Sequence, residues 1–228
     1  MGIITTTIDQ PGSAALVRLM TWLSPAFPVG AFAYSGGLEK AIAEERVSDR
    51  VSLEAWLSRL ATHGPLKTDA IFFSLAYKAG DADELTELNA LAEALAGSAE
   101  RYRETVALGS AFLASASAWP CAALGWLNGR AAYPVAAGAV SGGHHVGLEA
   151  GLSAYLHAAL SQLVSVAIRC SVIGQQVGVG MLAALEALVL DQARIAAVSR
   201  MDDLGSATIA ADIASMRHET QTTRLFRS

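Results

Sequence analysis

The sequence predicts a single all-α domain, a bundle of roughly eight to ten helices. Several segments repeat apolar residues at helical spacing, and none alternates apolar and polar residues between hairpin turns. The stretch after Pro134 is apolar around most of its circumference, as in helices at the centre of a bundle. No Pro/Gly/Ser-rich linker divides the 228 residues. We therefore expect one domain over residues 1–228, with residues 1–12 as an N-terminal extension.

The first two helices are predicted from apolar spacing and from the residues at their ends. Ser13 is expected to cap the first, which ends before the rigid turn at residues 24–28. Its apolar positions are Leu16, Leu19, Met20 and Leu23. The second follows Ser52 and closes at Gly64 and Pro65. Its apolar positions are Leu53, Trp56, Leu57, Leu60 and Ala61.

The next predicted helices have recognisable N-terminal signals. Asp81 with Glu84 three residues later resembles a capping box, and Ser98 can start the following helix. A long apolar helix is expected over residues 148–170. A further helix in the same style contains Met181, Leu182, Leu185, Leu188 and Val189. These segments complete the expected bundle.

Composition indicates a protein that buries surface against partners. Hydrophobic residues make up 53% of the chain and charged residues only 16%, so much of the surface must be weakly polar. The net charge is −5, and no Lys/Arg stripe interleaved with aromatic residues is present. This excludes the electrostatic pattern of a nucleic-acid binder. Residues 1–11 lack a signal-peptide pattern, and the two cysteines, Cys121 and Cys170, are expected to be buried free thiols. We expect a cytoplasmic protein.

One segment raises the alternative of a helical membrane protein. Residues 105–128 carry no charge and would span a bilayer if they were helical throughout. Their interior consists mostly of Ala, Ser and Gly, with Pro120 in the middle. Small, weakly apolar residues contribute little insertion energy, so we expect no membrane span.

Catalytic motifs are missing from the sequence. It contains no G-x-x-x-x-G-K-[ST] phosphate loop, no G-x-S-x-G elbow and no S-x-x-K pattern. Gly178 and Gly180 form a glycine pair that suits close helix packing better than nucleotide binding. His63 is expected at a helix C-terminus and His157 within the central helix. The chain is therefore expected not to be an enzyme.

A weak candidate metal site consists of His144, His145 and Glu149. His145 and Glu149 are four residues apart and would share a face if the segment were helical. No second histidine pair or cysteine lies nearby in the sequence to complete a coordination shell. A polar turn or a helix entry is the simpler interpretation, and no metal site is predicted.

Four segments carry a family resemblance. They are residues 23–39 (LSPAFPVGAFAYSGGLE), 134–138 (PVAAG), 154–175 (AYL through AIR to GQ) and 216–228 (MRHETQTTRLFRS). Together they resemble the UreF family of urease accessory proteins. Val172 and Ile173 in the third segment, and Val179 just after it, depart from the family pattern. Without the resemblance, the first segment would be interpreted as a helix connector and the last as a disordered tail.

The resemblance implies an all-helical, homodimeric, non-catalytic chaperone for urease maturation. Such a scaffold would join UreD to the GTPase UreG, regulate that GTPase, and couple GTP hydrolysis to nickel insertion into apo-urease. It would bind no cofactor directly, because its partners handle nickel and GTP. A direct nickel carrier that uses the histidines above remains an alternative function.

The resemblance also implies partner-binding residues near the N-terminal loop, in the central turn and in a docking tail at residues 217–228. In the tail, an apolar Leu-Phe pair lies between arginines, a composition suited to docking. The predicted partner-binding residues are Tyr34, Ser35, Glu39, Gln175, Arg217, His218, Glu219, Arg224, Leu225, Phe226, Arg227 and Ser228.

Overall fold

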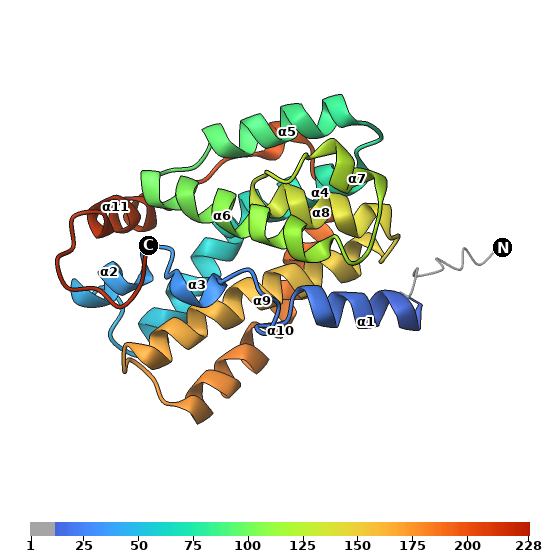
Figure 1. Cartoon of the computed structure of the whole chain (residues 1–228). Helices are drawn as coiled ribbons and strands as arrows, with labels where there is room; N and C mark the ends of the chain where they lie inside the picture. Colours follow the sequence, from blue (N-terminus) through green and yellow to red (C-terminus); the bar gives the residue numbers. More distant parts are fainter. Residues whose placement is uncertain (1–11) are drawn as a thin grey trace.

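A computed structural model describes residues 12–228, and over this range the chain is all-α, as predicted (Figure 1). It forms eleven α-helices, nine of them with ten residues or more, and two short 3₁₀-helices. Most of the predicted N-terminal extension lies outside the described residues. The first elements are α1 (Ser13–Trp22), η1 (Ala31–Ala33), α2 (Leu38–Ala43), α3 (Arg50–His63), α4 (Pro65–Lys78) and α5 (Ala82–Ala94). The others are α6 (Ala99–Ala116), α7 (Ala122–Trp126), α8 (Tyr133–Gly143), α9 (Leu148–Arg169), α10 (Gln175–Val198), η2 (Met201–Asp203) and α11 (Ile209–His218).

The centre of the bundle is built on close contacts between α4, α8 and α9. Glycines bring α8 against α4: an added Cβ would lie 2.3 Å from the Phe73 main-chain oxygen at Gly138 and 2.2 Å from the Tyr77 oxygen at Gly142. Every residue of α8 from Pro134 to Ser141 is buried. The helix predicted over residues 148–170 is α9, which packs against α10, α4, α2 and α3. The prediction of central apolar helices is confirmed.

Local signals set most helix starts, with two corrections. Asp81 caps α5 by accepting a hydrogen bond from the Glu84 N–H, and Ser98 caps α6 in the same way. Asp49 caps α3, with Ser52 as its capping-box partner, so the helix begins at Arg50 and not after Ser52. Ser13 is the first helical residue of α1 and caps nothing. The sequence did not distinguish a capping side chain from its neighbours inside the first turn.

The uncharged stretch at residues 105–128 is not one helix. The chain leaves α6 at Ala116, turns through Pro120, and forms the short helix α7. Within residues 12–228, α9 is the one helix that meets the length and apolarity expected of a membrane span. Half of its most apolar window is buried inside the bundle.

Several side chains are more exposed than the sequence suggested. Leu16 and Met20 of α1 lie on the surface, and His157 is an exposed residue of α9 that contacts the Ser161 hydroxyl. Both cysteines are free but only half-buried, so the prediction of full burial is wrong. Of the glycine pair in α10, Gly178 packs against Ile168, whereas Gly180 has open space beside it. Apolar periodicity marks a possible core face but does not show whether another helix covers it.

One end of the bundle brings distant parts of the chain together. In Figure 1 the C-terminus returns beside α2 and α11, and the preceding segment loops around them. Helix α11 packs against α2 and α6, which are remote from it in sequence. The candidate site lies at this end.

Candidate functional site

The candidate site is formed by two segments, a loop at residues 30–37 and a tail at residues 219–228. They are joined by main-chain hydrogen bonds. The Ser35 N–H donates to the Ser228 main-chain oxygen at 2.9 Å, and the Arg227 N–H donates to the Ala33 oxygen at 2.7 Å. The Ser35 hydroxyl also donates to the Ser228 oxygen. The tail is therefore an ordered part of the fold.

Glu39, at the start of α2, ties the tail to the bundle. One carboxylate oxygen accepts from the Leu225 N–H at 2.6 Å, and the other accepts from the Phe226 N–H at 3.2 Å. Gly37, which precedes the helix, has a φ of 80°, and an added Cβ would lie 2.7 Å from the Ser215 nitrogen of α11. Only glycine fits this close approach in a left-handed conformation, which places Glu39 under the tail.

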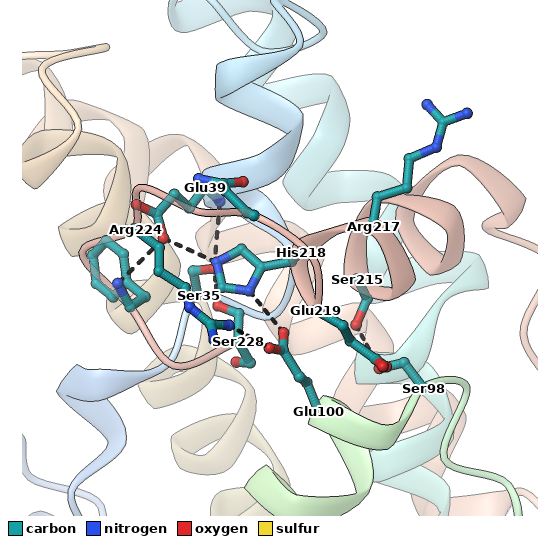
Figure 2. A network of polar contacts seen from close by, with 12 residues as sticks. Ser35, Glu39, Ser98, Glu100, Ser215, Arg217, His218, Glu219, Arg224 and Ser228 are labelled. Carbon is teal, nitrogen blue, oxygen red and sulfur yellow. Dashed lines mark hydrogen bonds and ion pairs between the residues drawn. The ribbon is translucent and has the colours of Figure 1, made fainter.

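His218 lies between two carboxylates (Figure 2). Its Nε2 is 3.0 Å from an oxygen of Glu39, and its Nδ1 is 2.7 Å from an oxygen of Glu100. The side chain is fully buried. Arg224 donates to the second oxygen of Glu100 at 2.7 Å. We call Glu39, Glu100, His218 and Arg224 the His218 cluster; it joins α2, α6, α11 and the tail.

Helix α9 holds the loop from the other side. The Gln162 amide donates to the main-chain oxygens of Ala31 and Tyr34, at 2.9 and 3.2 Å. Seven residues further along, Arg169 donates to the Phe32 oxygen at 2.6 Å. Every main-chain oxygen from Ala31 to Tyr34 accepts a hydrogen bond from α9 or from the tail. The irregular loop is therefore held in one conformation.

The loop and the tail together present apolar side chains to solvent. Phe32 is 68% exposed and Leu225 is 66% exposed. The cationic side chains of Arg227 and Arg169 are also exposed. Phe226 is only 3% exposed, so the Leu-Phe pair of the tail divides, with Phe226 facing the bundle and Leu225 facing out. The exposed residues Phe32, Arg169, Leu225 and Arg227 define what we call the loop–tail surface.

Most of the predicted partner-binding residues lie at this end of the bundle. The side chains of Ser35, Glu39, His218, Phe226 and Ser228 are buried and make contacts within the chain. Arg217 points away from the cluster and pairs with Glu44, while Glu219 accepts from the Ala99 N–H (Figure 2). Part of the tail is therefore buried and makes contacts within the chain. Only its exposed residues are accessible to a partner.

Gln175 lies apart from the other predicted residues. It is the exposed first residue of α10 and takes no part in the hydrogen bonds between loop and tail. The turn before α10 leaves its side chain exposed to solvent. Its role in binding stays a prediction.

Three residues that hold the site were missed from the sequence. Glu100 binds His218 and Arg224, Glu104 accepts from the Ser228 hydroxyl at 2.8 Å, and Gln162 holds the loop. Both glutamates lie in the first turns of α6, where acidic residues are common for reasons of helix stability alone. Their partners are more than a hundred residues away, so no local pattern marks them.

The weak metal candidates do not converge. Helix α8 ends at Gly143 and α9 begins at Leu148, so His145 and Glu149 are not on one helix face. His145 has a φ of 50° in the connecting turn, and Nε2 of His144 lies 3.0 Å from the Trp119 main-chain oxygen. In the part of the chain that the structure describes, no three His, Cys, Asp or Glu residues are grouped to hold a metal ion. His144 and His145 lie in the turn between α8 and α9.

A cavity of about 630 Å³ lies behind the loop. Its polar lining includes Asp69, Arg101, Glu104, Tyr133 and Tyr155. Arg101 donates to Asp69 and, at 3.2 Å, to Glu104, while the Tyr155 hydroxyl lies 3.3 Å from Asp69. Burial raises the pKa of both tyrosines, with the Asp69 charge as a further cause. Burial also raises the pKa of Glu104, although the Arg101 charge opposes this change. The cavity thus has a charged floor under apolar walls.

The fold and the site define an all-helical protein whose distinctive feature is an ordered loop and tail at one end of the bundle. The UreF family model matches residues 47–186. The urease accessory protein UreF of Agrobacterium fabrum is 58% identical over 220 residues, covering 96% of this chain and 99% of the relative. That of Rhizobium etli (strain CIAT 652) is 56% identical over 215 residues, covering 94% and 96%. The chain belongs to the UreF family of urease accessory proteins.

Proposed function

We propose that this protein is a scaffold and chaperone that joins UreD to the GTPase UreG during urease maturation. In this role it couples GTP hydrolysis by UreG to nickel insertion into apo-urease. It acts as a homodimer in the cytoplasm, and its partners handle GTP and nickel. Family membership supports the role in urease maturation. The loop–tail surface supports a role in binding another protein.

The observation that carries the proposal is the pairing of exposed apolar residues with an ordered backbone. Phe32 and Leu225 are each about two-thirds exposed, on segments that hydrogen bonds hold in place. Exposed aromatic and aliphatic side chains on a rigid support lose little conformational entropy on binding. The neighbouring Arg227 and Arg169 favour a partner with an acidic rim around an apolar groove.

The effect of removing these side chains can be estimated. Complete burial of a Leu or Phe side chain contributes about 1.5 to 3 kcal/mol. A Phe32→Ala/Leu225→Ala double variant is therefore expected to bind UreD at least about tenfold more weakly. Neither side chain belongs to the core, so the variant should fold normally.

The test is co-expression with the cognate UreD, followed by affinity capture and light-scattering mass. Val51→Ala is the matched control, because Val51 is an exposed apolar residue of α3 outside the loop–tail surface. The proposal predicts a two-to-two assembly for the wild type and the control, and loss of captured UreD for the double variant. Equal capture of UreD by the wild type, the control and the double variant would show that the loop–tail surface does not bind UreD. Failure of the wild type to capture UreD would contradict the scaffold role.

The second stage of the test adds UreG. The captured complex with UreD should retain UreG, and the retention should differ between GTP and GDP, because a coupled scaffold must contact the two nucleotide states differently. Equal retention in both states would contradict the coupling to GTP hydrolysis.

A further inference from the structure

The cavity behind the loop has the size and the lining of a small-molecule site. Its volume of about 630 Å³ lies within the range of roughly 300 to 1,000 Å³ that is typical of such sites. Apolar walls around a few fixed polar groups suit a molecule with an apolar body and a polar head. The apolar walls include Leu60, Leu66, Phe72, Leu108 and Leu163.

The polar floor of the cavity has hydrogen-bonding capacity that the fold does not use. Arg101 donates to Oδ2 of Asp69 and to Glu104, and the Tyr155 hydroxyl lies 3.3 Å from the same Asp69 oxygen. Within residues 12–228, Oδ1 of Asp69 accepts no hydrogen bond, and the Tyr133 hydroxyl makes none. A bound molecule can therefore use both groups without breaking a contact of the fold.

Trp22 adds a buried donor to the lining. Its side chain is 1% exposed, and its Nε1–H has no acceptor in the part of the chain that the structure describes. A buried N–H group without an acceptor is costly to the fold. The indole ring is fixed by an edge-on contact with Trp119, at 5.8 Å between ring centroids. A molecule in the cavity that carries an acceptor can supply the missing hydrogen bond.

The charges of the floor favour a cation. Asp69 and Glu104 share one guanidinium group, that of Arg101, so formal negative charge is in excess. Burial and the Asp69 charge raise the pKa of Tyr133 and Tyr155, whose rings lie 5.4 Å apart next to this carboxylate. A carboxylate beside aromatic rings attracts organic ammonium and guanidinium groups. Within residues 12–228, these carboxylates belong to no group of three possible metal ligands.

We propose that the cavity is a binding site for a small organic cation. A protonated amine or a guanidinium group is bound by Asp69, an apolar body fills the space between the walls, and an acceptor on this body meets Trp22. The site does not depend on the scaffold role. It nevertheless reaches the loop, because Ala31, Tyr34 and Gly36 form part of its wall.

The test compares three probes that share one ring and one phenolic hydroxyl: the cation tyramine, the neutral alcohol tyrosol and the anion 4-hydroxyphenylacetate. Isothermal titration of the full-length protein at about pH 7, where an alkyl amine is protonated, measures each affinity. Tyramine should bind with a Kd below about 1 mM and at least about tenfold more tightly than tyrosol, as expected for one charge-assisted hydrogen bond. The anion should bind more weakly than either.

Asp69→Asn is the discriminating variant. Its amide oxygen can still accept from Arg101, but the carboxylate charge is lost, so the preference for tyramine over tyrosol should fall to about threefold or less. Asp191→Asn is the matched control, because Asp191 is an exposed carboxylate of α10 outside the cavity. The control should keep the wild-type preference. An Asp69→Asn protein that also keeps it would overturn the proposal.

Two measurements on the wild type remain decisive if Asp69→Asn does not fold. Hydrogen–deuterium exchange locates the probe: tyramine should slow exchange of the loop at residues 30–37, which forms one wall, and tyrosol at equal concentration should slow it less. Equal affinity for the three probes, or no binding of tyramine up to about 10 mM, would mean that the cavity holds only solvent. Saturable binding that leaves exchange of the loop unchanged would place the cation elsewhere and also contradict the proposal.

Discussion

The guanidinium carbon of Arg169 lies 4.2 Å from the centre of the Phe226 ring. The same side chain donates a hydrogen bond to the Phe32 main-chain oxygen at 2.6 Å. One residue of α9 thus contacts both the tail and the loop, with its charge over an aromatic face and its N–H group on a carbonyl. Arginine is suited to this double contact because its planar group stacks and donates at once.

Replacing Arg169 by Met should loosen the tail without unfolding the bundle. The loss of the cation–π contact and of the hydrogen bond is expected to cost about 1 to 2 kcal/mol in tail docking, seen as about a fivefold or greater increase in exchange of the tail amides. Arg169→Lys should recover only part of this loss. Arg103→Met, at an exposed arginine of α6, is the control. Unchanged tail exchange in Arg169→Met would contradict the bridging role.

The close approach of α8 to α4 predicts opposite effects for two helical glycines. Gly138→Ala places a methyl group against the Phe73 main-chain oxygen and should destabilise the fold by about 2 kcal/mol or more, because two helices must separate. Gly180→Ala, in α10 with open space beside it, should stabilise by about 0.5 to 1 kcal/mol through helix propensity. Urea denaturation measures both. Similar effects at the two positions would show that helix propensity, not packing, governs them.

The ion cluster at the cavity floor should be sensitive to loss of its cation. Arg101→Met leaves the half-buried Asp69 and the buried Glu104 without their shared cation, and should cost about 3 to 5 kcal/mol. Arg194→Met removes an exposed pair with Asp191 and should cost less than about 1 kcal/mol. Thermal or urea unfolding tests the difference. A small loss in Arg101→Met would mean that the cavity admits enough water to solvate both carboxylates.

Two tyrosines, the buried Tyr155 and the half-buried Tyr133, predict a limit to stability at alkaline pH. Burial and the Asp69 charge raise the pKa of Tyr133 and Tyr155 above the ordinary value of 10.0. A group whose pKa is higher in the folded protein than in the unfolded chain contributes its full stabilisation at pH values below the unfolded pKa. That contribution is lost as the pH rises through the folded pKa. The fold should therefore weaken above about pH 10, with two of the five tyrosines ionising only on unfolding. An ultraviolet titration measures this.

Tyr133→Phe provides the control for the alkaline limit. It removes one group that the unfolded chain can ionise, so the pH of alkaline unfolding should move upward. Tyr102→Phe changes a more exposed ring on α6 and should leave the limit in place. Ionisation of all tyrosines near pH 10 without unfolding would be inconsistent with their burial.

Most of the fold follows from local sequence signals, whereas the site follows only in part. The all-α class, the central helix α9 and the caps at Asp81 and Ser98 depend on residues within one or two turns of each other, which a single sequence displays. The family resemblance pointed to the loop and the tail as separate partner-binding segments and did not show that they lie together. It did not separate Leu225, which faces solvent, from Phe226, which faces the bundle.

Three features that the sequence did not reveal have a common physical cause. The burial of His218 depends on Glu100, 118 residues earlier, and the exposure of Gln175 depends on how the α9–α10 turn meets the rest of the bundle. The failure of the His145–Glu149 pairing comes from a turn whose left-handed residue ends the helical register. Tertiary packing decides each case, and sequence spacing carries no information about it.

The contact between Ser35 and Ser228 spans 193 residues, and this separation has a consequence for biosynthesis. At ordinary rates of translation, about 10 to 40 s pass between the synthesis of the loop and that of the tail. Until then the loop lacks its main-chain partners, and only α9 can hold it. A nascent or prematurely terminated chain therefore cannot display the loop–tail surface. Assembly of the loop–tail surface is therefore delayed until residues 219–228 have been synthesised.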